Sequence, residues 1–143
     1  MELPDVPSSD ELRFQTRLRT RWVDEDNQAV LNNAIYLTLM EEGRLAYFTS
    51  LGLMDAARFP FVLAAANLRF LAPGRGGCEV LLEMSTVHLG ESSFTQAYRI
   101  KDGESGEVWC EALHRLVAWD NQTRAKRAMD GEFRARVAEF EGL

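Results

Sequence analysis

One long apolar segment constrains the fold of this 143-residue chain more than any other feature. Residues 34–51 read AIYLTLMEEGRLAYFTSL, and their apolar side chains would cover more than one stripe of a helix. Asn32 and Asn33 precede the segment, where asparagine side chains accept hydrogen bonds from the free N–H groups of a first turn, and Gly52 follows it. The pattern predicts a helix that is buried on most of its sides.

Strands are predicted on both sides of this helix. Residues 12–23 alternate between apolar and polar side chains, with the period of two that is typical of a strand with one solvated face. Four more strands follow the helix, separated by turns rich in glycine, aspartate and serine. Their ranges are about 61–71, 78–89, 93–101 and 107–119. Because short turns join antiparallel neighbours, these four strands are expected to form a meander.

The order of these elements predicts an α+β fold. A curved, five-stranded antiparallel sheet wrapped around the central helix would bury the apolar surface of that helix. No linker, repeat or low-complexity stretch divides the sequence, so we expect one domain over residues 1–143, with its core at about 12–120 and a short helix at about 131–141. The sheet would leave one edge strand free to pair with a second copy, which predicts a homodimer or homotetramer.

Charge and residue usage exclude several classes of protein. The net charge of −6 argues against nucleic-acid binding, which needs an excess of lysine and arginine. No apolar stretch is long enough for a membrane span, and the first residues lack the pattern of a secretory signal, so we expect a cytoplasmic protein with no membrane partner. The two cysteines and two histidines form no cluster with the spacing of metal ligands, and His88 and His114 are expected to be core or sheet-face residues.

The segment between the first strand and the helix carries the densest chemistry. Asp24, Glu25 and Asp26 are adjacent, and a desolvated carboxyl among like charges would have a raised pKa, which suits a base or nucleophile. The helix start offers free backbone N–H groups near Asn33 and Ala34 that could stabilise an oxyanion. The residues alone leave open a plainer interpretation, in which the acids form a solvated turn before a helix.

Three segments around the helix start form one extended motif: the acids at 24–26, the NNAIYL segment at 32–37 and the EEGR segment at 41–44. This motif resembles the signature DxD...(G/H)VNNxxYLxxxEEaR of the 4-hydroxybenzoyl-CoA thioesterase family. The segments RFLAPG at 69–74 and LGESSF at 89–94 resemble two later family motifs in the same order. The similarity covers about residues 12–120.

This resemblance implies a hotdog fold and hydrolysis of a small or medium acyl-CoA. In the family, the acid that corresponds to Asp26 is the nucleophile or general base, and the backbone amide at about Asn33 binds the thioester oxygen. Asp24 would orient the loop. The family uses no metal and no organic cofactor, so CoA would enter only as part of the substrate. The expected substrate contacts are Asp24, Asn32, Tyr36, Arg69, Ser92 and Ser93, with Arg75 as a further candidate for the CoA phosphates.

Other residues offer alternatives. Glu41 and Glu42 are a second choice for the catalytic base, because some hotdog thioesterases place it on the central helix; one of them should be enclosed, although pairing between Glu41 and Arg44 is favoured over catalysis. Aromatic side chains that could line an acyl pocket, or simply form the core, are Trp22, Tyr47, Phe48, Phe59 and Phe61.

One departure from the family pattern supports a different function. Residues 29–31 are Ala-Val-Leu, where many members have Gly-His-Val, so a histidine that assists in some members is absent. This favours the alternative of a non-catalytic hotdog module that binds acyl-CoA or serves as an assembly unit.

Overall fold

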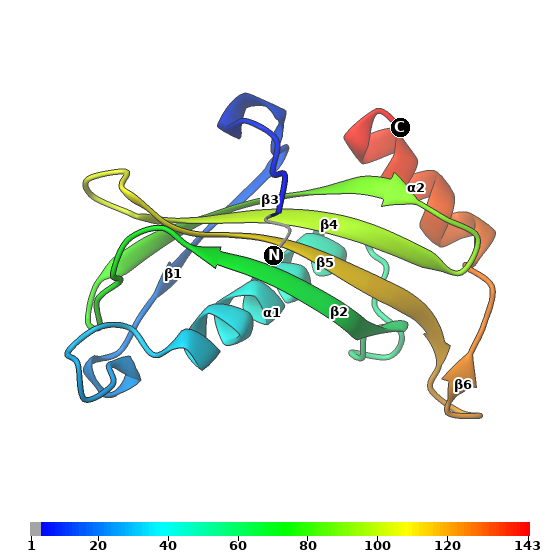
Figure 1. Cartoon of the computed structure of the whole chain (residues 1–143). Coiled ribbons are helices and arrows are strands. Elements are labelled where there is room, and N and C mark those ends of the chain that lie inside the picture. Colours follow the sequence, from blue (N-terminus) through cyan, green and yellow to red (C-terminus); the bar gives the residue numbers. More distant parts are fainter. Residues whose placement is uncertain (1–3) are drawn as a thin grey trace.

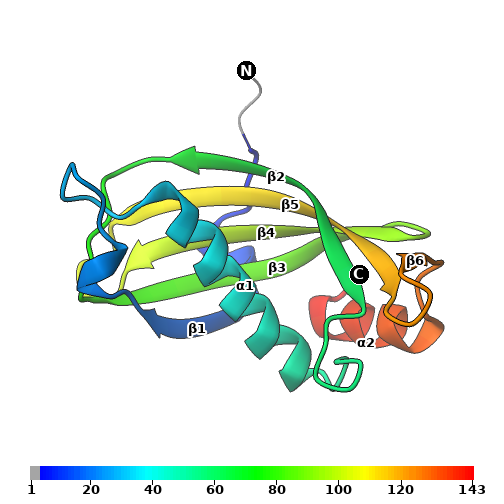
Figure 2. The same cartoon turned by 90° about the horizontal axis from the view of Figure 1, so that it is seen from below.

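The computed structural model describes residues 4–143, and Figure 1 shows a curved sheet with one long helix beside it. The elements in chain order are β1 (Phe14–Arg19), α1 (Asn33–Ser50), β2 (Phe61–Phe70), β3 (Glu79–Leu89), β4 (Ser93–Asp102), β5 (Val108–Asp120), β6 (Ala125–Lys126) and α2 (Gly131–Glu141). Short 3-10 turns occur at Ser9–Glu11 and Trp22–Asp24. Figure 2 shows α1 lying across one face of the strands, so the predicted α+β hotdog fold is confirmed.

The strand order corrects part of the predicted meander. The order is β1-β3-β4-β5-β2, with every pair antiparallel and β6 added to β5. β3, β4 and β5 are neighbours as expected, but β2 pairs with β5 and not with β3. The turn after β2 does not reverse the chain into a hairpin, because Leu71 continues to donate to the Trp109 carbonyl and Gly74 accepts from Leu31. This arrangement makes β2 one edge strand of the sheet, with β1 at the other edge.

Helix α1 packs one side against the sheet and leaves the other side open. Tyr36, Met40 and Phe48 are buried in the core. Gly43 lets the helix lie close to β3, since a Cβ there would clash with the side chain of Leu82. The prediction of burial on most sides is wrong for the opposite face, where Leu45 is 49% exposed, because no element of the described chain packs over it.

A buried polar network joins α1 to the sheet. The Arg44 guanidinium is buried and donates to Tyr98 Oη over 3.2 Å and to His114 Nδ1 over 2.9 Å. The predicted pairing with Glu41 is wrong: among residues 4–143, Arg44 forms no ion pair, because it points to the sheet while Glu41 lies on the open face. His114 is a core residue as expected, and His88 is exposed on the sheet.

The second helix closes the far end of the sheet. The buried Glu141 carboxylate accepts from Tyr47 Oη over 2.6 Å, from Ser85 Oγ over 2.9 Å and from the Thr86 amide over 2.7 Å. Phe133 stacks on Phe48 with ring centroids 5.4 Å apart. These contacts tie α2 to the end of α1 that is farther from the acid-rich loop. Within residues 4–143, neither helix combines the length and apolar character needed to cross a membrane.

Candidate active site

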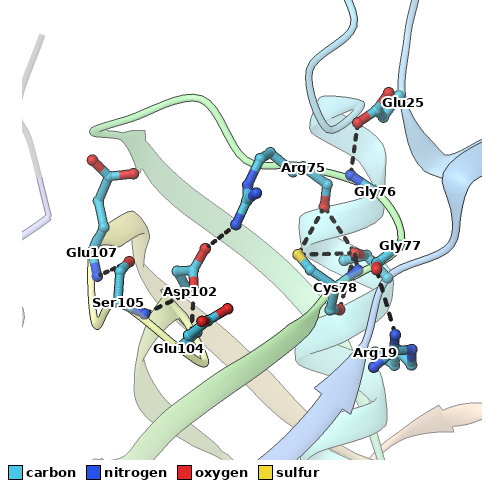
Figure 3. Close-up of polar contacts among 11 residues, drawn as sticks. Arg19, Glu25, Arg75, Gly76, Gly77, Cys78, Asp102, Glu104, Ser105 and Glu107 are labelled. Atoms are coloured by element: carbon cyan, nitrogen blue, oxygen red, sulfur yellow. Dashed lines mark hydrogen bonds and ion pairs between the residues drawn. The ribbon is translucent and has the colours of Figure 1, made fainter.

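The acid-rich loop lies against the turn between β2 and β3. Glu25 forms an isolated antiparallel bridge with Leu31, and the Leu31 amide donates to the Gly74 carbonyl over 2.9 Å. The Glu25 carboxylate accepts from the Gly76 amide over 2.9 Å, as Figure 3 shows. The loop from 24 to 32 is therefore held at the start of α1 from both sides.

The three adjacent acids have different surroundings. Asp24 is buried, and its carboxylate accepts from the backbone and guanidinium of Arg21. Burial would raise the pKa of Asp24, but the Arg21 hydrogen bonds outweigh it and hold the pKa below its usual value. The prediction of a raised pKa is therefore wrong for Asp24, which is the buried acid among the three. Asp26 is exposed, and among residues 4–143 its carboxylate accepts one hydrogen bond, from the Gln28 amide over 2.7 Å.

The first turn of α1 retains a free donor. Asn32 caps the helix: its Oδ1 accepts from the Ala34 amide over 3.0 Å, and its carbonyl accepts from the Ile35 amide over 2.9 Å. The Asn33 amide has no acceptor within the described part of the chain, and the residue is exposed. A helix start carries a partial positive charge, so this N–H is suited to hold an oxygen that becomes negative during a reaction.

Tyr36 connects the helix start to the turn that follows β2. Its ring is buried and lies 5.3 Å from that of Phe70, and burial raises the pKa of its hydroxyl to about 12. A Cβ at Gly74 would come within 2.6 Å of Tyr36 Oη, so only glycine fits there. Tyr36 was predicted as a substrate contact. Its side chain is buried and packs the helix start against Phe70 and Gly74.

The turn after β2 also carries a charged pair. Arg75 donates to Asp102 over 2.6 Å, and the Arg75 side chain remains 61% exposed (Figure 3). Hydrogen bonds from the Ser105 amide, Arg75 and the Glu104 amide lower the pKa of Asp102 to about 2. Arg69 is exposed near the same end of β2. Two arginines therefore lie on the acid-loop side of the sheet.

The remaining predicted contacts are not brought to this end. Ser92 and Ser93 belong to the β3–β4 hairpin at the α2 end, where Met129 donates to the Glu91 carbonyl. Within one chain they are separated from the acid loop by the length of the strands. Glu41 and Glu42 are both exposed on the open face of α1, so the prediction that one is enclosed is wrong.

One cavity lies beside the middle of α1, and a second lies beyond its end. One has a volume of about 470 Å³ and is lined by Glu41, Glu42, Leu45, Phe59 and Phe61. The other has a volume of about 430 Å³ and lies between the end of α1 and α2. Met54 borders both.

The aromatic side chains predicted to line an acyl pocket differ in their positions relative to these cavities. Met54, which was not predicted from the sequence, lines both cavities. Phe59 and Phe61 line a cavity, and Phe61 is also a buried core residue, as are Tyr47 and Phe48. Trp22 is 79% exposed and is no wall of either cavity, because it lies in a surface 3-10 turn. No local signal marked Met54, since the cavity walls come from segments far apart in the sequence.

Comparisons with known proteins identify the family of this chain. The family model for the thioesterase superfamily matches residues 28–108. The long-chain acyl-CoA thioesterase FadM of Escherichia coli is 27% identical over 135 residues, which covers 89% of this chain and 98% of that protein.

Solved structures share the fold of this chain. A thioesterase from Thermus thermophilus, crystallised with coenzyme A and Zn, is 27% identical with a TM-score of 0.81, covering 94% of this chain and 98% of that one. A 1,4-dihydroxy-2-naphthoyl-CoA thioesterase from Synechocystis shares the fold at 18% identity, with a TM-score of 0.77 and coverage of 88% and 96%.

Proposed function

This chain belongs to the thioesterase superfamily and is a thioester hydrolase, and on that premise we propose that it cleaves acyl-CoA thioesters at the acid loop and the start of α1. One observation carries the location: the exposed Asp26 carboxylate lies in the loop from 24 to 32, and the unfilled Asn33 amide belongs to the residue directly after that loop. They are the complementary parts that acyl transfer needs, a nucleophile or base and an oxyanion donor.

The proposed reaction follows from these two groups. The thioester carbonyl oxygen accepts the Asn33 N–H, which polarises the carbonyl carbon. Asp26 then attacks that carbon, or removes a proton from a water that attacks it, and negative charge develops on the oxygen held by the amide. The C–S bond breaks, the sulfur takes a proton, and water supplies the hydroxyl of the acid product. Asp24 keeps the loop in shape through its bonds to Arg21.

The CoA part of the substrate needs cations near the acid loop. Arg69 and Arg75 are exposed on that side and can meet phosphate oxygens, since guanidinium groups bind them in pairs of hydrogen bonds. Ser92 and Ser93 could contribute only from a second copy of the chain. An antiparallel pair of β2 strands would place the Phe61 end of one copy beside the Phe70 end of the other, which brings the second copy's hairpin toward this acid loop.

The edge strand supports this pairing as a homodimer. β2 is ten residues long and exposed over most of its length, with Val62, Leu63 and Phe70 each 38–48% exposed. A long apolar edge left open promotes pairing with another chain. Leu63→Lys is therefore expected to shift the mass in solution, measured by light scattering after gel filtration, from that of two chains to that of one. A wild-type protein that already has the mass of one chain would contradict the pairing.

The proposed chemistry requires no metal. Among residues 4–143, no three His, Cys, Asp or Glu side chains gather as metal ligands, and Asp26 with the Asn33 amide can perform the reaction without one. We expect the hydrolysis rate to be unchanged after treatment with EDTA and gel filtration. A rate that falls with EDTA and returns with Zn²⁺ would refute the metal-free mechanism.

A thiol-release assay tests the proposed function. The intact protein is mixed with a panel of acyl-CoAs that differ in chain length and in aromatic content, and free CoA is followed with a thiol reagent. Release above the uncatalysed rate on at least one substrate is expected. Binding of acyl-CoA without release on any substrate would instead favour a non-catalytic binding module.

A further inference from the structure

We infer that the pantetheine arm of an acyl-CoA substrate lies over Trp22, and that Arg21 and Arg75 bind the pyrophosphate at the end of that arm. This inference rests on the proposed function, because it starts from a thioester held between Asp26 and the helix start. It deepens that function, since it names the residues that recognise the thiol half of the substrate.

Trp22 is the most exposed large apolar residue of the described chain. It is 79% exposed, and its neighbour Val23 is 67% exposed. The 3-10 turn that carries both is held by its own backbone: the Asp24 amide donates to the Arg21 carbonyl over 3.0 Å, and the Glu25 amide donates to the Trp22 carbonyl over 3.3 Å. A large aromatic ring in water gains free energy when a ligand covers it, and an ordered turn reduces the entropy that binding costs.

Two arginines beside Trp22 are held with their guanidinium groups toward water. Arg21 pairs with Asp24 over 2.9 Å, and the two side chains are 73% and 7% exposed. Arg75 pairs with Asp102 over 2.6 Å, with side chains 61% and 6% exposed (Figure 3). In each pair a buried carboxylate fixes a guanidinium group that remains accessible. Guanidinium groups fixed in this way suit phosphate oxygens, which they bind through pairs of hydrogen bonds.

Gly76 brings Arg75 against the turn that carries Trp22. A Cβ at Gly76 would come within 2.4 Å of the Arg21 carbonyl oxygen and 3.0 Å of Trp22 Cα, so the two backbones are in contact. The Gly76 amide also donates to the Glu25 carboxylate over 2.9 Å (Figure 3). The aromatic ring and the two guanidinium groups therefore come from adjoining turns, although they are far apart in the sequence.

This surface adjoins the proposed reacting groups. The Asn32 amide donates to the Asp24 carbonyl over 2.8 Å, so the chain that follows Trp22 lies against the residue before Asn33. Trp22 precedes Asp26 by four residues, and at the reach of an extended chain their Cα atoms lie at most about 14 Å apart.

The length of the pantetheine arm determines which part of CoA reaches Trp22. In an extended arm, about 11 bonds or 13 Å separate the thioester carbon from the dimethyl carbon of the pantoyl group. About 14 bonds or 16 Å separate the thioester carbon from the first phosphorus. The pantoyl methyl groups thus match the distance to the Trp22 ring, and the pyrophosphate matches the arginines beside it. The adenine base lies farther out.

A second copy of the chain fits this surface less well. Trp22 and Val23 offer far less area than the roughly 800 Å² that each partner buries in a stable interface. The accessible guanidinium groups of Arg21 and Arg75 favour an anionic occupant, and the pyrophosphate of CoA supplies the charge that an apolar protein surface lacks.

Three thioesters of one acyl group test the inference, because they shorten the thiol half in steps. Coenzyme A carries the pantetheine arm and the phosphates, pantetheine carries the arm alone, and N-acetylcysteamine lacks both the pantoyl group and the phosphates. Trp22→Ala is expected to raise KM by about tenfold for the first two and to leave it unchanged for the third. Arg75→Gln should raise KM by a similar factor for the CoA thioester alone. In both variants kcat should keep its wild-type value, since neither residue touches the reacting carbon.

Conservative and distant substitutions are the controls. Trp22→Phe keeps an aromatic ring and should keep KM within about threefold of wild type. Leu143→Ala removes another exposed apolar side chain, at the C-terminus, and should keep the wild-type KM. Binding has a separate readout: free CoA should shift the fluorescence emission of the wild-type protein to shorter wavelength as water leaves the Trp22 ring. This shift should be absent from Trp22→Phe.

Different outcomes separate this inference from the proposed function. An unchanged KM in Trp22→Ala with every thioester, an equal rise with all three, or no emission shift with CoA would overturn the inference and leave the hydrolysis intact. Loss of the dimer mass in Trp22→Ala would show that a second chain covers the ring, and would also overturn it. If the wild-type protein hydrolyses no thioester, the proposed function fails, and the emission shift alone decides whether the arm binds at Trp22.

Discussion

Asp26→Asn is expected to lower kcat for acyl-CoA hydrolysis by roughly 100-fold or more, since a positioned base or nucleophile contributes at least this much. The amide keeps the size of the carboxylate and can still accept the Gln28 N–H. It can neither attack a thioester nor remove a proton from water. KM should change little, because Asp26 is proposed to act on the reacting carbon and not on CoA. Steady-state thiol release measures both constants.

A matched variant on α1 separates the two candidate acids. Glu41→Gln makes the same chemical change on an exposed carboxylate of α1. Its kcat is expected to stay within about threefold of wild type, an effect far below the one that loss of a base would cause. Both variants should unfold at the wild-type temperature, because both side chains are exposed. Loss of kcat in Glu41→Gln with a normal rate in Asp26→Asn would move the base onto the helix.

His114→Gln is expected to make the protein less sensitive to acid. Burial, with a smaller effect of the nearby Arg44 charge, lowers the pKa of His114 to about 3 from an ordinary value of 6.5. The unfolded chain therefore takes up a proton below pH 6.5 that the folded chain refuses. Stability supplied by the neutral ring is fully present above pH 6.5 and is lost as the pH falls toward 3. A neutral glutamine removes this dependence.

The size of this pH dependence follows from the one proton that the His114 ring takes up in the unfolded chain. Each pH unit within the window is worth about 1.4 kcal/mol, so between pH 6.5 and 4.5 wild type should lose about 3 kcal/mol more than the variant. Urea unfolding at pH 7 and pH 4.5 gives the two differences, and any constant cost of the substitution cancels between them. Asp102 does not interfere, because its contribution is lost only below its ordinary pKa of 3.8. Equal losses in the two proteins would refute the buried neutral His114.

Local patterns predicted the elements well. The alternation in 12–23 and the cap at Asn32 are properties of neighbouring residues, and the structure has β1 at Phe14–Arg19 and α1 starting at Asn33. The position of β2 in the sheet was not predicted correctly. Short turns were taken to join neighbouring strands, but β2 pairs with β5 and not with β3, which follows it in the sequence. Pairing of β2 with β5 depends on contacts between residues far apart in the sequence, such as Phe61 with Ala118.

The candidate site was predicted in part. The resemblance pointed to Asp26 and Asn33, and their roles stay predictions that the activity measurements must test. Composition could not show that Arg21 rather than a like charge controls the pKa of Asp24, since that depends on how a single 3-10 turn folds. The direction of Arg44 was missed for a similar reason: helical spacing offers Glu41 as a partner, but only the fold shows that Tyr98 and His114 are nearer.

The central claim is that the thioester lies between Asp26 and the start of α1. It is tested most directly by a crystal structure of the protein with an acyl-CoA analogue in which a CH2 group replaces the thioester sulfur. The thioester then becomes a ketone that cannot be hydrolysed. The account predicts that the ketone oxygen accepts the Asn33 N–H at about 3 Å, with the Asp26 carboxylate beside the carbonyl carbon. A ketone bound beside Glu41, or anywhere away from the Asn33 amide, would contradict it.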